Sequence, residues 1–198
     1  MEFNVVLAGV GGQGTILAAE ILGVAAVKDG LNVRVSEIHG MAQRGGAVTS
    51  SVRIGENVLS PTVLDGQADV LLGFEPLETV RNLKCASGKT LVILSDECIP
   101  PTELSAKNAA YPAMDKIVEK IRGFSERITV VETERLAGEA GSILTQNIVL
   151  IGALAATGKV PVRIESLREA LRELVPAKHV EMNLKAFELG YEYMKKKV

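Results

Sequence analysis

Short apolar runs alternate with amphipathic stretches between Val5 and Val131, a pattern typical of an α/β protein. Several of these runs are apolar at every position, as strands buried on both faces of a parallel sheet are. Between the runs, apolar residues recur every three or four positions, and this spacing predicts helices. The expected strands cover residues 5–8, 33–36, 47–54, 69–74, 90–94 and 128–131, and the expected helices begin after Gly14, at Pro76 and near Met114.

The first forty residues predict a strand–helix–strand unit, most simply a right-handed parallel crossover. The next segment breaks this rhythm, because residues 39–46 (HGMAQRGG) show no period and contain three glycines. Residues 47–54 then alternate between apolar and polar positions, and a turn at 55–57 would return residues 58–59 as a hairpin partner. We therefore expect a β-hairpin excursion here, and irregular segments of this kind often carry function.

The C-terminal third is expected to be helical. Residues 142–157 are apolar on nearly every face, which predicts a buried central helix. Ser166 and Glu169 resemble a capping box for a helix that runs to about Val175, and a last helix presents an apolar stripe from Val180 to Met194. Together these patterns predict an α/β fold: a three-layer, mostly parallel, Rossmann-like sheet with a β-hairpin excursion and a helical C-terminal third, in a single domain over residues 1–198.

Composition narrows the function. The chain has 198 residues, 47% of them hydrophobic, and a formal charge of −2, so it can form one well-packed domain without a basic surface for nucleic acid. No apolar run reaches the roughly 18 residues of a membrane span, and the first residues do not have the pattern of a signal sequence. We expect a reduced, cytoplasmic protein with no nucleic-acid partner, no membrane partner and no metal site.

A glycine-rich turn follows the first strand and opens the first helix. Gly9, Gly11 and Gly14 form a G-x-G-x-x-G pattern, and the free amides and positive dipole of a helix start favour phosphate or carboxylate. Glu37 lies at the end of the second strand, where a dinucleotide-binding fold places an acidic residue against a ribose. A self-sufficient NAD(P)-dependent oxidoreductase is therefore one alternative, and a tight turn that binds nothing is another.

Three polar side chains lie in the short loop that follows the second strand. His39 can transfer protons near neutral pH, and the planar guanidinium of Arg44 suits carboxylate or phosphate. Gln43 completes the group, and the loop is expected beside the carboxyl ends of the strands, where α/β folds bind ligands. The simpler alternative is a surface loop whose polar side chains are only solvated.

Two segments at this separation make the chain recognisable: GVGGQG at 9–14 and EIHGMAQRGGAVTSSVRIG at 37–55. The chain resembles the small catalytic-domain subunits of 2-oxoacid:ferredoxin oxidoreductases, and its HGM-x-QRGG form is most similar to the beta subunit of the indolepyruvate type. Pyruvate- and 2-oxoglutarate-type gamma subunits are close relatives. The resemblance covers essentially the whole chain, including ADVLLGFEPLE at 68–78 and TQNIVLIGAL at 145–154.

The resemblance implies one subunit of an enzyme that decarboxylates an aryl pyruvate oxidatively, with coenzyme A as acceptor of the acyl group and ferredoxin as acceptor of electrons. Thiamine diphosphate and 4Fe-4S clusters are expected on a large alpha partner, and ferredoxin is reached through the complex. This chain has no Gly-Asp-Gly signature with paired asparagines, and two cysteines cannot ligate a tetrathiolate cluster. A scaffold that only stabilises the partner is a further alternative.

The same resemblance implies site residues. The expected catalytic residues are His39, Gln43 and Arg44, which would position substrate or intermediate. Contact with a cofactor, coenzyme A in first place, is expected at Gly9, Gly11, Gly12, Gln13, Gly14, Gly45, Gly46 and Asn147.

Overall fold

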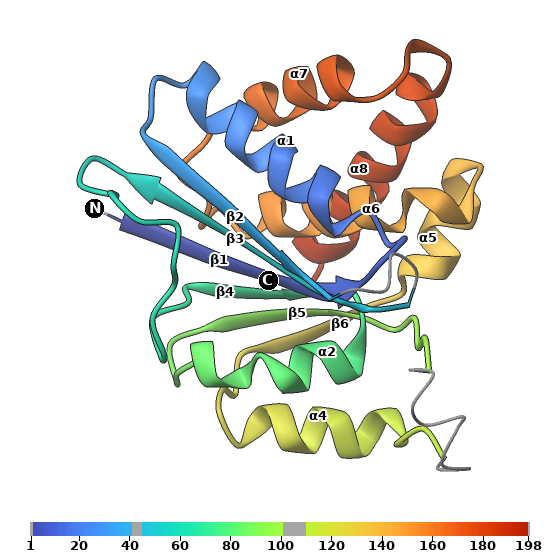
Figure 1. The fold of residues 1–198 in the computed structure, drawn as a ribbon. Coiled ribbons are helices and arrows are strands. Elements are labelled where there is room, and N and C mark those ends of the chain that lie inside the picture. Colours follow the sequence, from blue (N-terminus) through green and yellow to red (C-terminus); the bar gives the residue numbers. More distant parts are fainter. Residues whose placement is uncertain (1, 41–44, 101–109, 198) are drawn as a thin grey trace.

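The computed structural model describes residues 2–40, 45–100 and 110–197, and these form one six-stranded sheet with helices on both faces (Figure 1). The strands are β1 (Glu2–Val10), β2 (Val33–His39), β3 (Ala47–Gly55), β4 (Val70–Gly73), β5 (Leu91–Ser95) and β6 (Ile128–Val131). The helices are α1 (Thr15–Lys28), α2 (Pro76–Arg81), α4 (Met114–Arg122), α5 (Thr133–Ala140), α6 (Gln146–Ala156), α7 (Ile164–Leu174) and α8 (Val180–Lys195). Single 3-10 turns occur at η1 (Leu83–Cys85), η2 (Ile143–Thr145) and η3 (Ala177–His179).

The sheet has the order β2-β3-β1-β4-β5-β6 and is mostly parallel, as predicted. Strands β1, β4, β5 and β6 pair in parallel, whereas β3 is antiparallel to both β1 and β2. The β1-α1-β2 unit therefore joins two strands of the same direction, as a crossover does, but β3 lies between them. Strand β3, which follows β2 in the chain, thus occupies the position beside β1 that a simple crossover would give to β2.

The predicted hairpin exists, but with a different partner. β3 pairs with the preceding strand, Ile54 opposite Val33, and not with residues 58–59, which lie outside the strands. The prediction for residues 58–59 was wrong because both edges of β3 are already filled. Val52, for example, lies between Val5 of β1 and Val35 of β2.

Strand β1 separates two hydrophobic cores. Val5 and Leu7 point into the larger core with α1, α6, α7 and α8, and Val6 and Ala8 point into the smaller core with α2 and α4. Figure 1 shows these two groups of helices on opposite sides of the sheet, which gives the predicted three layers. A strand buried on both faces must be apolar at every position, which is why this run could be recognised in the sequence.

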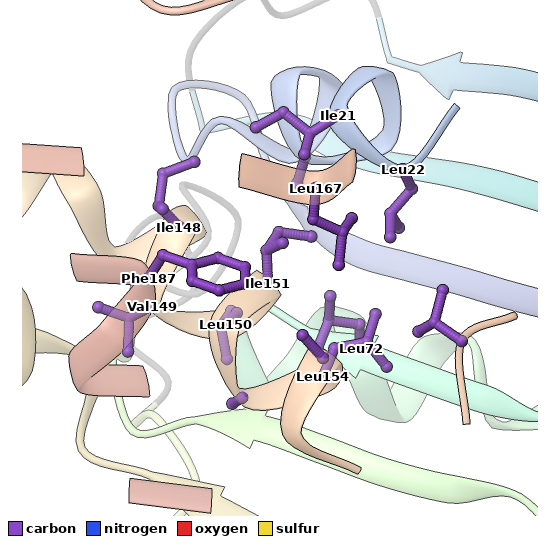
Figure 2. Packing of buried hydrophobic residues seen from close by; sticks show 14 of the residues in the cluster. Ile21, Leu22, Leu72, Ile148, Val149, Leu150, Ile151, Leu154, Leu167 and Phe187 are labelled. Carbon is purple, nitrogen blue, oxygen red and sulfur yellow. The ribbon is translucent and has the colours of Figure 1, made fainter. Parts of the chain in front are cut away.

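Helix α6 is the centre of the larger core. Its residues 147–155 are all buried, and Figure 2 shows the side chains of Ile148 and Ile151 beside Phe187 of α8. The backbones of α6 and α8 touch, because a Cβ added at Gly152 would lie 2.0 Å from the Phe187 carbonyl oxygen. The α-helix begins at Gln146 rather than at Ser142, after the 3-10 turn η2. No single helix of the described chain could span a membrane; the bent pair of residues 133–140 and 143–156 passes by length and composition alone.

The capping box predicted at Ser166 is absent. Helix α7 begins at Ile164, so Ser166 lies inside its first turn, and its hydroxyl donates to Asp29 at the end of α1. The Asp29 carboxylate also accepts from the backbone N–H of Arg163, the residue that precedes the helix, at 2.6 Å. The start of α7 is thus capped by a residue 134 positions earlier, and no local pattern reveals such a partner.

Candidate functional site

The glycine turn lies where the chain changes direction across the sheet. After β1 the chain continues to β2 and β3 on one side, whereas β4, β5 and β6 follow on the other. Open α/β sheets bind ligands at the carboxyl ends of the strands beside such a switch point. Here the switch point lies between the end of β1, with Gly11 to Gly14, and the end of β4, with Phe74.

The side chain of Gln13 fills this switch point. Its Oε1 accepts from the Val10 N–H at 2.9 Å, and its Nε2 donates to the Phe74 carbonyl at 2.9 Å and to Glu97 Oε2 at 2.8 Å. All the hydrogen-bonding capacity of the amide nitrogen is therefore used within the protein. Gln13 holds β1, β4 and the segment after β5 together. Its expected contact with a cofactor stays a prediction.

The two glycine-rich segments of the sequence meet at this point. The Gly11 N–H donates to the Gly46 carbonyl at 2.8 Å, and the Gly45 N–H donates to the Gly11 carbonyl at 3.2 Å. The described end of the loop after β2, at Gly45 and Gly46, therefore lies beside the turn, as the order of elements predicted. His39 ends β2 with an exposed side chain, and Gln43 and Arg44 lie outside the described residues, so their catalytic roles stay predictions.

The motif glycines serve different purposes. A Cβ at Gly9 would lie 2.8 Å from Cβ of Phe74, and one at Gly14 would lie 2.4 Å from Nδ2 of Asn147. These two glycines allow close packing, and Asn147 itself is buried and donates to the Gly14 carbonyl at 3.3 Å. Gly12 differs, because its φ is +104° and nothing would lie within 4 Å of its Cβ. Of these three glycines, Gly12 is the one a ligand can approach closely.

Unpaired donors surround a cleft on the α1 side of the turn. The N–H groups of Gly12, Gly14 and the first three residues of α1, 15–17, make no hydrogen bond to any described residue. The Thr15 hydroxyl is buried and also lacks a partner within the described chain. These groups line or border a cleft of 400 Å³ at the positive end of the helix dipole. Its one acidic lining residue, Glu20, is exposed to solvent.

A second cleft, of 260 Å³, lies on the other side of the turn. The backbones of Gly11, Gly12 and Gly45 form part of it, and the rest of the lining comes from Val10, Gln13, Glu97, Ile99, Ile143, Leu144 and Gln146. Glu97 was not predicted from the sequence. Its place directly after a buried strand was the available signal, because side chains at the carboxyl ends of parallel strands face the ligand crevice.

Beside this cleft, a buried carboxylate anchors the start of α2. Glu75 is fully buried and accepts from the Glu78 N–H at 2.8 Å and from the Tyr111 hydroxyl in a short hydrogen bond. Burial and the bond to Glu75 raise the pKa of Tyr111 well above its usual value. Partial burial also raises the pKa of Cys98, whose thiol lies next to Tyr111. This group fixes the loop before α4 against α2, and we assign it a structural role.

The geometry disfavours the dinucleotide alternative. Glu37 is opposite Ser50 of β3, which is opposite Leu7 of β1. Glu37 therefore lies two strand spacings, each about 4.8 Å, from β1. Along the strands it is level with Leu7, well before the glycine turn. It cannot contact a ribose whose phosphate lies at Gly12. The described residues also contain no group of three or more His, Cys, Asp or Glu side chains that could hold a metal ion.

The sheet and its glycine turn define a Rossmann-like α/β domain, and comparison with known proteins identifies its family. Residues 4–193 match the pyruvate ferredoxin/flavodoxin oxidoreductase family, so the chain belongs to that family. The indolepyruvate oxidoreductase subunit IorB of Thermococcus kodakarensis is 45% identical over 98% of this chain and 96% of that protein. IorB of Pyrococcus horikoshii is 43% identical, over 98% of this chain and 96% of its own length.

More distant relatives have other names. The pyruvate/ketoisovalerate oxidoreductases common subunit gamma of Thermococcus kodakarensis is 29% identical over 92% of both chains. Among solved structures, the gamma subunit of keto/oxoacid ferredoxin oxidoreductase from Geobacter sulfurreducens is 28% identical, with a TM-score of 0.69 over 97% of this chain and 98% of that one. These likenesses support the predicted family and fold.

Proposed function

We propose that this chain is the small subunit of an indolepyruvate:ferredoxin oxidoreductase, which converts an aryl 2-oxoacid and coenzyme A into an acyl-CoA, carbon dioxide and reduced ferredoxin. The similarity to IorB subunits carries this proposal, because it reaches 45% identity over 98% of the chain, against 29% for the pyruvate/ketoisovalerate gamma subunit. A pyruvate- or 2-oxoglutarate-type enzyme is the alternative within the family. The chain therefore acts as part of a heteromeric oxidoreductase.

A large partner subunit holds the redox groups in this proposal. Thiamine diphosphate and 4Fe-4S clusters would supply decarboxylation and electron transfer there. The residues of this chain do not fit either group: its sequence has no Gly-Asp-Gly signature with paired asparagines for thiamine diphosphate, and its two cysteines cannot ligate a tetrathiolate cluster. What this chain contributes is a rigid glycine turn and the loop of His39, Gln43 and Arg44, which would face the partner's site and position substrate or intermediate.

Coenzyme A would place a phosphate group at the start of α1. Open space above Gly12, unpaired amides in the turn and the buried Thr15 hydroxyl support an anion in the 400 Å³ cleft. Backbone amides and the helix dipole suit a phosphate oxygen without a side-chain cation. Arg44 would add charge from the neighbouring loop.

The test measures viologen reduction with indolepyruvate and coenzyme A by this chain, by the large subunit and by both together. We expect activity only from the pair, with a loss on His39→Ala or Arg44→Ala while the two subunits still co-purify. Equal activity of the large subunit alone would contradict a catalytic contribution. Unchanged turnover by both variants would instead support the scaffold alternative.

A further inference from the structure

The 260 Å³ cleft has a chemistry different from that of the phosphate-type cleft. Each cleft has one carboxylate in its lining and, among the described residues, no Lys, Arg or His, but Glu97 here is half-buried whereas Glu20 of the other cleft is exposed to solvent. An anion there would meet a like charge, which costs free energy. This cleft is therefore suited to a group that is not negatively charged.

The carboxylate of Glu97 presents one oxygen without a partner. Its Oε2 accepts from Gln13 Nε2 at 2.8 Å, whereas its Oε1 makes no hydrogen bond to any residue in the described parts of the chain. Glu97 is half-buried, so this oxygen is only partly solvated. A carboxylate oxygen in such a place is best satisfied by a donated hydrogen bond, and bonds to a charged acceptor are the strong ones.

The remaining side chains of the lining are mostly apolar, and Gln146 adds a side-chain donor. Val10, Ile99, Ile143 and Leu144 supply aliphatic surface. Gln146 accepts from the Thr133 hydroxyl through Oε1 at 2.7 Å, which leaves its Nε2 without a partner in the described chain. Apolar walls with a few placed polar groups are typical of small-molecule sites, and the volume is below that of a drug-sized site, so it suits one small ring or a similar apolar group.

We propose that this cleft binds a planar, uncharged, nitrogen-containing aromatic ring whose N–H donates to Glu97. This rests on the proposed function, which offers two such rings: the indole of the 2-oxoacid and the adenine of coenzyme A. Indole has one N–H and no ring acceptor, whereas adenine has an amino group and ring nitrogens that accept. Gln146 Nε2 would therefore bond to adenine but not to indole.

Glu97→Gln gives a sharp test because the orientation of the new amide is determined in advance. Gln13 is held by the Val10 N–H and the Phe74 carbonyl, so it must present its NH2 group to position 97. The new side chain must then turn its oxygen to Gln13 and its own NH2 to the cleft. The substitution replaces an acceptor by a donor there, and a ring N–H finds no partner.

The experiment uses the assembled complex and two kinetic measurements. The first is the ratio of kcat/KM for indolepyruvate to that for phenylpyruvate, whose ring has no N–H; the second is the KM for coenzyme A. If the ring is indole, Glu97→Gln lowers the ratio roughly tenfold or more and leaves the KM for coenzyme A unchanged. Gln146→Leu then changes neither the ratio nor the KM for coenzyme A. If the ring is adenine, both variants raise the KM for coenzyme A by a similar factor and the ratio stays constant.

Controls separate binding from folding and assembly. Glu119→Gln removes an exposed carboxylate on α4 and is expected to leave both measurements unchanged. If Glu97→Gln does not fold, Ile99→Phe replaces it, because the larger side chain fills the cleft and should affect the same measurement. Weaker assembly with normal kinetics at saturating partner would overturn the proposal, since Glu97 would then pair with a partner's cation. Unchanged values in both measurements would also overturn it.

The two proposals fail separately. If none of the aryl 2-oxoacids supports viologen reduction by the complex and another 2-oxoacid does, the proposed function is wrong. The KM for coenzyme A, measured with that other 2-oxoacid, then still tests the cleft. If aryl 2-oxoacids are oxidised and neither measurement responds to Glu97→Gln, the cleft assignment is wrong and the proposed function stands.

Discussion

Gln13 is the side chain whose loss should damage this region most, because one amide joins three segments. It accepts from Val10 at the end of β1, donates to Phe74 after β4, and donates to Glu97 after β5. Leucine has a similar size but no polar atoms. Gln13→Leu therefore removes all three hydrogen bonds and leaves the Val10 N–H, close to the core, without its partner.

The expected loss follows from these contacts. Each bond to a neutral backbone group contributes about 1 kcal/mol, and the bond to the Glu97 carboxylate contributes about 1.5–3 kcal/mol. Adjacent bonds are not independent, and leucine gains some burial energy, so the total is smaller than these values taken together. We expect Gln13→Leu to lower the free energy of unfolding by about 3 kcal/mol.

An added charge at position 13 tests the polarity of the same bonds. Gln13→Glu keeps an acceptor for Val10 but turns a carboxylate toward the Phe74 carbonyl and the Glu97 carboxylate, so it should also destabilise the protein. Adding Glu97→Gln supplies an amide donor in place of the second carboxylate. The double variant should therefore be more stable than the two single effects predict, by at least about 1 kcal/mol.

Guanidinium denaturation of the full chain, followed by circular dichroism, measures these differences. Gln67→Leu is the matched control, because Gln67 is exposed and its side chain makes no hydrogen bond to a described residue. We expect that control to lie within about 0.5 kcal/mol of the parent protein. A Gln13→Leu variant equally close to the parent, or a double variant without coupling, would refute the bracing role.

Two further predictions concern the helices of the larger core. Asp29→Ala should cost about 1–2 kcal/mol at neutral pH, because the carboxylate caps α7. Burial opposes ionisation of Asp29, but its hydrogen bonds with Ser166 and Arg163 lower its pKa below 3.8. The carboxylate's contribution to stability is therefore complete above pH 3.8 and is lost as the pH falls through the folded-state pKa. Urea denaturation curves of variant and parent should converge only in acid. Gly152→Ala should cost about 1–3 kcal/mol by thermal unfolding, because its Cβ would meet the Phe187 carbonyl at 2.0 Å. Gly138→Ala, in α5 with nothing within 4 Å, should instead stabilise by about 0.5–1 kcal/mol, and equal effects at both glycines would contradict the close approach of α6 and α8.

Much of the fold could be predicted because the burial of a strand or helix determines which of its own residues are apolar. A strand such as β1, covered on both faces, must be apolar throughout, and α6 must be apolar on all sides because helices and the sheet surround it. Pro76 begins α2 as predicted, because its missing N–H is not needed in a first turn. These features depend on residues close together in the chain.

The errors arose where a distant residue supplied the partner. The segment at 58–59 cannot pair with β3, since β1 and β2 already occupy both of its edges. Ser166 resembles an N-cap, yet it lies inside α7, and its hydroxyl and the N–H of Arg163 both donate to Asp29 at the end of α1. The spacing of Glu37 in the sequence suited a dinucleotide site, but β3 lies between β2 and β1 and separates Glu37 from the glycine turn.

The candidate site divides in the same way. The sequence alone determined a glycine turn between a buried strand and a helix, because glycine permits the backbone conformations and close approaches that such a turn needs. It also placed a second glycine segment at the carboxyl ends of the strands, and the structure showed that this segment bonds to the turn. Only the tertiary structure decided that Gln13 fills the switch point, that Gly12 is open where Gly9 and Gly14 are closely packed, and that Glu97 and Gln146 share a cleft. Those outcomes depend on which strands become neighbours, and strand order is set by the packing of the whole chain rather than by any local stretch.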